Sequence, residues 1–120
     1  MAANIGPRRL VVGAHYGLRD WLAQRATAVV MAVYAIAVGV YAVFVLPPGY
    51  EAWAGLFVPL WMKVATLVAI GALVYHVWVG MREIFMDYVK PTSIRLFAYL
   101  LTLLWLAACA VWSVQILWRV

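Results

Sequence analysis

His76 places an imidazole inside a long apolar run, and it is the residue of this chain best suited to chemistry. The nearest charged residues are Lys63, close to the start of the run, and Arg82, beyond its apolar part. An ionisable group in such a run is energetically unfavourable unless it faces protein or a cofactor. Imidazole can bind a metal, transfer a proton or form a hydrogen bond. His76 is therefore the first candidate for any of these roles.

The residues that share a helical face with His76 are small. Spacings of three and four residues put them in one stripe along a helix. The stripe is Ala65, Ala69, Ala72, His76 and Gly80. An imidazole that projects from a helix face of small side chains suits a flat macrocycle such as haem, which can lie against that face. Gly80 permits close approach of a backbone or a ring edge.

Three interpretations of His76 stay open from the residues alone. The first, which the residues by themselves favour, is a helix–helix seam with His76 hydrogen-bonded across it. The second is axial ligation of haem, and the third is a transported proton or ion. The other histidine, His15, lies in the N-terminal arm, so a haem with two histidine ligands would need one from another polypeptide.

Three further residues could take part in chemistry at the membrane surface. Tyr88 is of a type common in the aromatic belt, but a phenol can also donate a hydrogen bond to a quinone carbonyl. Asp87 beside it could orient the phenol or relay a proton. Arg25 opens the first apolar run and either anchors the helix or binds a carboxylate, such as a haem propionate, in bidentate fashion.

Membrane-spanning helices are needed to position these residues. The 120 residues are 69% hydrophobic and 11% charged, with a mean hydropathy of +1.00, whereas soluble domains are about half apolar and a quarter charged. Apolar runs at about 26–46, 58–81 and 96–118 predict three transmembrane helices. At about 1.5 Å per residue the first run covers roughly 31 Å, enough for a hydrocarbon core. We expect a single all-α membrane domain with a cytoplasmic arm over 1–24 and no cleaved signal peptide.

Loop residues and flanking charges predict the helix ends. Residues 47–49, Pro-Pro-Gly, should stop the first helix. The hydroxyl of Thr92 or Ser93 should cap the third. Lys63 lies near the start of the second span, where its side chain should snorkel to the interface beside Trp61.

The basic residues predict the orientation. There are nine Lys and Arg residues and a net charge of +5. Seven lie on one predicted side: Arg8, Arg9, Arg19, Arg25, Arg82, Lys90 and Arg95. Lys63 and Arg119 lie opposite, so the N-terminus should be cytoplasmic, or in the matrix of a mitochondrion. Because these charges flank apolar runs, nucleic acid is not an expected partner.

A spaced pattern of residues points to a protein family. It reads His76-x3-Gly80-Met81-x5-Asp87-Tyr88-Val89-Lys90-Pro91, with Asp20-Trp21 and Arg25-Ala26-Thr27-Ala28 earlier and Tyr34 beyond. It resembles the smaller, D-type hydrophobic anchor subunit of bacterial and mitochondrial succinate dehydrogenases. The similarity runs from about Gly17 to the third span, which matches only in apolar character. Arg19 departs from the pattern, because some relatives carry a histidine there.

The resemblance implies a role for each matching residue. The three helices would form half of a heterodimeric haem-binding bundle, with His76 as one axial ligand of the iron of haem b and the other from a C-type cytochrome b anchor subunit. Arg25 would lie near the haem propionates. Tyr88 would hydrogen-bond ubiquinone, the substrate, with Asp87 beside it. Flavoprotein and iron–sulfur subunits would dock on the cytoplasmic surface.

The expected function is thus that of a succinate dehydrogenase membrane anchor, a subunit of electron transport and the tricarboxylic acid cycle that is not catalytic alone. The expected location is a bacterial inner membrane, with the mitochondrial inner membrane as the second choice. Three alternatives remain: a fumarate reductase anchor that uses menaquinone, a three-span transporter subunit with a proton-coupling His76, and a scaffold subunit without a cofactor.

Overall fold

Four helices make up the described part of the chain. The computed structural model describes residues 12–120, so Arg8 and Arg9 lie outside it. The helices are α1 (Val12–Phe44), α2 (Tyr50–Leu56), α3 (Leu60–Tyr88) and α4 (Thr92–Arg119). The three long ones contain segments that are long and apolar enough to cross a membrane, over Gly17–Phe44, Leu60–Tyr88 and Thr92–Arg119. The all-α prediction with three spans is confirmed at this level, and the short α2 was not expected.

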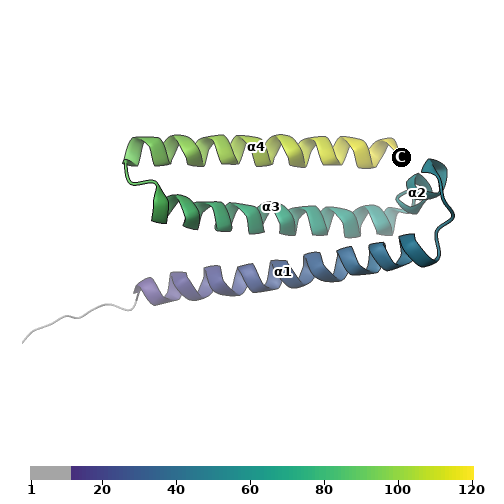
Figure 1. Cartoon of the computed structure of the whole chain (residues 1–120), viewed down its shortest axis with the longest axis horizontal. Helices are drawn as coiled ribbons and strands as arrows, with labels where there is room; N and C mark the ends of the chain where they lie inside the picture. Colours follow the sequence, from purple (N-terminus) through teal and green to yellow (C-terminus); the bar gives the residue numbers. More distant parts are fainter. Residues whose placement is uncertain (1–11) are drawn as a thin grey trace, which may run out of the picture.

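The long helices form a layer one helix thick. Figure 1 shows α3 in the middle, with α1 on one side and α4 on the other, and both outer helices pack against it. Among the side chains that the structure describes, five are buried: Met62, Ala69, Val79, Leu106 and Leu117. Val79 on α3 is the most enclosed, at 1% exposed. Most apolar side chains therefore face outward, as expected for lipid or protein as the surrounding medium.

α1 and α3 extend beyond the apolar runs that predicted them. α1 already begins at Val12, so the charged residues of the arm from Arg19 to Arg25 lie on the same continuous helix as the span. α3 continues to Tyr88, past Arg82. Charged residues such as Arg and Glu are good helix formers, so charge ends a hydrophobic run without ending a helix.

The backbone turns where the prolines and glycine predicted it. α1 ends at Phe44, and Gly49 immediately before α2 has φ 119° and ψ 160°, a conformation nearly restricted to glycine. The predicted hydroxyl cap of α4 is wrong: Pro91 is the N-cap residue and makes no side-chain cap hydrogen bond. Thr92 and Ser93 are already inside the first turn, where their hydroxyls cannot cap it.

Among the described side chains, three polar contacts join α1 to α3. Asp20 forms an ion pair with Arg82. Thr27 Oγ1 lies 3.0 Å from His76 Nδ1, and Tyr34 Oη lies 2.7 Å from Thr66 Oγ1. The α1 members recur every seventh residue, the spacing of a shallow left-handed crossing, and their α3 partners run in the opposite direction. These contacts define the register of the antiparallel pair.

Aromatic contacts join α4 to α3. The Tyr99 ring centroid lies 5.8 Å from that of Trp78 and 5.9 Å from that of Phe85. At the other end of the pair, Lys63 Nζ lies 5.4 Å from the centroid of Trp118 in the last turn of α4. This cation–π contact gives the ammonium of Lys63 a partner near the helix ends.

Replacement of Gly49 by alanine tests the turn between α1 and α2. Gly49→Ala should lower the free energy of unfolding by about 1–3 kcal/mol, because alanine rarely adopts this backbone conformation. Thermal unfolding in detergent micelles measures the effect. The control is Gly55→Ala inside α2, where an added Cβ meets open space and should be neutral or stabilising. Equal effects of the two variants would contradict the role of Gly49.

Candidate functional site

His76 lies on the face of α3 that packs against α1, and its ring is half-buried. Its Nδ1 atom lies 3.0 Å from the hydroxyl oxygen of Thr27. The small stripe faces the same way, since Ala69 is buried and a Cβ on Gly80 would lie 3.7 Å from Gln24 Nε2. The seam interpretation is therefore confirmed for this face of α3. It uses one ring nitrogen of His76, and no hydrogen bond to Nε2 is formed by the described residues.

Gln24 is a polar residue of this seam that was not predicted from the sequence. Its Oε1 atom is buried and has no hydrogen-bond partner among the described residues. Gln24 precedes Thr27 by three residues, so the two side chains share a face of α1. The available signal was this spacing of two polar residues at the start of an apolar run.

A charged hollow lies at the predicted cytoplasmic end of the α1–α3 pair. It has a volume of about 850 Å³ and is lined by Arg19, Asp20, Ala23, Tyr75, Arg82, Glu83 and Met86. Two of the lining residues, Asp20 and Arg82, form an ion pair. The sequence pointed to a role for Arg82 in membrane orientation alone, and its pairing with Asp20 was not predicted. Asp20 is the only acidic residue before Glu51, and this was the signal that it needed a basic partner.

Arg25 is not brought together with His76. Its guanidinium carbon lies 5.4 Å from the ring centroid of Trp21, one turn earlier on α1. Thr27 lies two positions after Arg25, a rotation of about 200° around the helix, so the two side chains leave it on nearly opposite sides. Arg25 is thus exposed at the end of the span and available to a group outside this chain.

Asp87 and Tyr88 form the last turn of α3 and are exposed, Tyr88 at 79%. The described residues show no hydrogen bond between these two side chains, so the expected orientation of Tyr88 by Asp87 is not seen in the chain alone. Twelve residues of helix separate His76 from Tyr88, a distance of roughly 18 Å along the axis. A ligand at His76 and a ligand at Tyr88 would therefore occupy different depths in the membrane.

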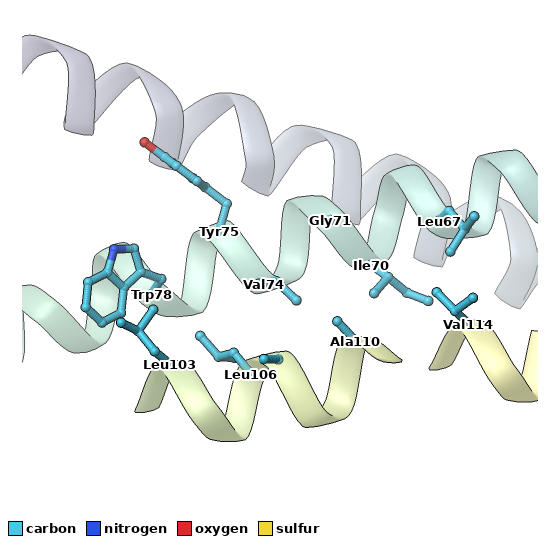
Figure 2. Close-up of a pocket in the computed structure, with 11 residues that line it drawn as sticks. Leu67, Ile70, Gly71, Val74, Tyr75, Trp78, Leu103, Leu106, Ala110 and Val114 are labelled. Carbon is cyan, nitrogen blue, oxygen red and sulfur yellow. The ribbon is translucent and has the colours of Figure 1, made fainter. Parts of the chain in front are cut away.

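The groove between α3 and α4 is apolar. Its volume is about 530 Å³, and its lining includes Val74 and Trp78 on α3 and Leu106 and Ala110 on α4. Figure 2 shows these side chains between the two helices, whereas Tyr75 extends from α3 toward the α1 side. The groove offers no acid, base or nucleophile, so it suits an apolar surface.

The potential metal-binding side chains fit ligation of a haem iron better than a metal site built by this chain alone. Within the described residues, no three His, Cys, Asp or Glu side chains gather closely enough to hold a metal ion. A haem iron, by contrast, needs a single imidazole from each side. His76, with Nε2 unengaged by the described residues, meets that requirement.

Two hydroxyl side chains of α4 hydrogen-bond to carbonyl oxygens of their own helix. Thr102 donates to Ala98 O at 2.9 Å, and Ser113 donates to Cys109 O at 2.7 Å. Each hydroxyl is thus satisfied within its own helix. This arrangement offers no support for the transporter alternative.

Comparisons with known proteins agree with the sequence pattern. Residues 1–114 match the family described as succinate dehydrogenase/fumarate reductase transmembrane subunit. The chain is also similar to the succinate dehydrogenase hydrophobic membrane anchor subunit of Coxiella burnetii (strain RSA 493 / Nine Mile phase I). The two are 42% identical over 102 residues, which cover 85% of this chain and 89% of the relative.

A match over almost the whole chain, with three apolar helices, leaves little room for the transporter or scaffold alternatives. The chain therefore belongs to the succinate dehydrogenase/fumarate reductase transmembrane-subunit family and is a multi-pass membrane anchor subunit of succinate dehydrogenase (complex II).

Proposed function

We propose that His76 supplies one axial ligand of a haem b held between this anchor and a second, C-type anchor subunit. Members of this family commonly bind haem b. The observation that carries the proposal is the half-buried ring of His76, whose Nδ1 contacts Thr27 while Nε2 has no partner among the described residues. The other axial ligand must come from the partner, since no other histidine lies in the apolar spans.

Arg25 is the proposed contact for a haem propionate. Its guanidinium lies where the apolar part of α1 begins, on the side toward which His76 is displaced, and among the described residues it contacts the ring of Trp21. Guanidinium binds carboxylates in bidentate fashion, and a cation–π contact leaves its N–H donors free. Because Arg25 faces away from Thr27, the propionate would have to approach from outside the α1–α3 seam.

Tyr88 and Asp87 are the proposed contribution of this chain to ubiquinone reduction. The exposed phenol at the end of α3 can donate a hydrogen bond to a quinone carbonyl oxygen and stabilise the negative charge that develops there. Asp87 is exposed at the same membrane surface, where it can pass on a proton from the cytoplasm. The 79% exposure of Tyr88 leaves room for quinone and for the iron–sulfur and C-type subunits to complete the pocket.

The chain contributes binding and positioning, and its partners contribute the oxidation of succinate. Flavoprotein and iron–sulfur subunits dock on the cytoplasmic surface, where the basic residues place Tyr88. Electrons from succinate reach ubiquinone there, and two protons are taken up from the same side. A bound haem supplies a one-electron carrier within the membrane. The proposed location is a bacterial inner membrane with a cytoplasmic N-terminus.

Fumarate reduction is the alternative direction of turnover, because the matching family includes both enzymes. The relative from Coxiella burnetii favours succinate oxidation. Ubiquinone is the proposed substrate in that direction, and menaquinone would accompany the reverse reaction. The two directions are distinguished by measuring the rates of succinate oxidation and fumarate reduction by the purified complex with each quinone.

Replacement of His76 tests the ligand. His76→Leu removes the imidazole, so the assembled complex should lose haem or change its spectrum, as measured by dithionite-reduced minus oxidised absorption. Leu73→Ala, an exposed position on the same helix, should leave the spectrum unchanged. An unaltered bis-histidine spectrum in His76→Leu would disprove the assignment.

Replacement of Tyr88 tests the quinone contact. Tyr88→Phe removes only the hydroxyl, and quinone reduction should slow by about 100-fold, the loss typical of one donor to a developing oxyanion. Transfer from succinate to a soluble dye that accepts electrons before quinone should not change. Tyr50→Phe, an exposed tyrosine at the other end of the layer, is the matched control. A normal quinone rate in Tyr88→Phe would exclude the proposed hydrogen bond.

A further inference from the structure

The hydrogen bond between Thr27 on α1 and the ring of His76 determines which ring nitrogen is free to bind a ligand. Thr27 Oγ1 lies 2.7 Å from Ala23 O, 3.2 Å from Gln24 O and 3.0 Å from His76 Nδ1. A hydroxyl has one proton to donate, and a backbone carbonyl can only accept. The shortest of the three contacts, to Ala23 O, takes that proton.

The remaining contact must then run in the other direction. With its proton directed at Ala23 O, Thr27 Oγ1 presents a lone pair to Nδ1, which must carry the hydrogen to form a bond. A neutral imidazole has one N–H, so the lone pair lies on Nε2. We propose that Thr27 is a positioning residue that holds His76 in the Nε2 lone-pair tautomer and fixes the plane of its ring. This inference rests on the proposed haem ligation.

The seam around Thr27 is built to keep this geometry. The Asp20–Arg82 ion pair lies two turns of α1 to one side of Thr27, and the Tyr34–Thr66 hydrogen bond lies two turns to the other. Both hold α1 and α3 in one register. Gly80, one turn beyond His76, faces Gln24: a Cβ at this position would lie 3.7 Å from Gln24 Nε2, at ordinary contact distance. Thr27 therefore cannot drift from Nδ1 without breaking neighbouring contacts.

A hydrogen-bond acceptor at Nδ1, the ring nitrogen that would not bind the iron, also makes the imidazole a stronger ligand. A histidine that donates its other N–H is oriented and made more basic, and loss of such a partner commonly weakens metal binding by about 10- to 100-fold. A more basic axial imidazole stabilises ferric over ferrous iron, so it lowers the midpoint potential of a haem. α1 thus acts on the haem through Thr27 without touching the iron.

The test compares three replacements of Thr27 in the purified complete complex. Thr27→Val keeps the shape and removes the acceptor, so haem affinity should fall about 10- to 100-fold, the midpoint potential should rise and the low-spin ferric EPR spectrum should change. Thr27→Ser keeps the hydroxyl and should restore all three. Thr27→Cys, whose sulfur is a weak acceptor, should give an intermediate potential and serves if the valine variant does not assemble.

Two controls separate the possible failures. Thr102→Val makes the same change on α4, where the hydroxyl donates to Ala98 O of its own helix. It should leave the EPR spectrum unchanged; an equal effect would mean that Thr27 does not act through Nδ1 of His76. If His76→Leu changes the spectrum while Thr27→Val and Thr27→Cys match the wild type, the positioning role is overturned and the ligand assignment stands. If His76→Leu changes nothing, the ligand assignment itself has failed.

Discussion

A layer one helix thick has no interior in which a polar ring can be fully enclosed. α3 has neighbours on two sides only, and most of the apolar side chains described face outward. In lipid, an imidazole in such a layer must find hydrogen-bond or ligand partners on a neighbouring helix or another molecule. His76 meets this constraint in part through Thr27. The rest of the ring must be satisfied by what covers the layer in the assembled enzyme.

The same constraint explains why α1 and α3 are joined by polar groups. Apolar side chains gain little from packing together in lipid, since the tails are equally apolar. The α1–α3 pair instead uses an ion pair at its charged end and two hydrogen bonds at successive depths. α4, which carries no proposed ligand, contacts α3 through apolar side chains, aromatic rings and a cation–π contact between the described residues. The polar contacts that define the helix register therefore lie in the α1–α3 pair, which contains His76.

α3 separates two proposed tasks by depth. His76 lies within the apolar part of the helix, and Tyr88 lies at its end, roughly 18 Å away along the axis. One helix would therefore set the distance between the proposed haem within the membrane and the proposed quinone site at its surface. The exposed Tyr88 and the half-buried His76 both leave surface that other subunits can cover, as expected for a membrane anchor subunit.

The sequence by itself determined the three spans and a turn at Pro47, Pro48 and Gly49, because bilayer thickness and proline impose local rules, although the first helix ends at Phe44 and not at Leu46. It singled out His76 as the candidate ligand, because an ionisable group in an apolar span is unfavourable without a partner. It also indicated the family through the spacing from His76 to Pro91. Only the tertiary structure paired Thr27 with His76 and Asp20 with Arg82, placed α2 in the loop and assigned Pro91 rather than a hydroxyl to the start of α4. The physical reason is that membrane helices are apolar on every face, so hydrophobic periodicity does not define how one helix is rotated against the next.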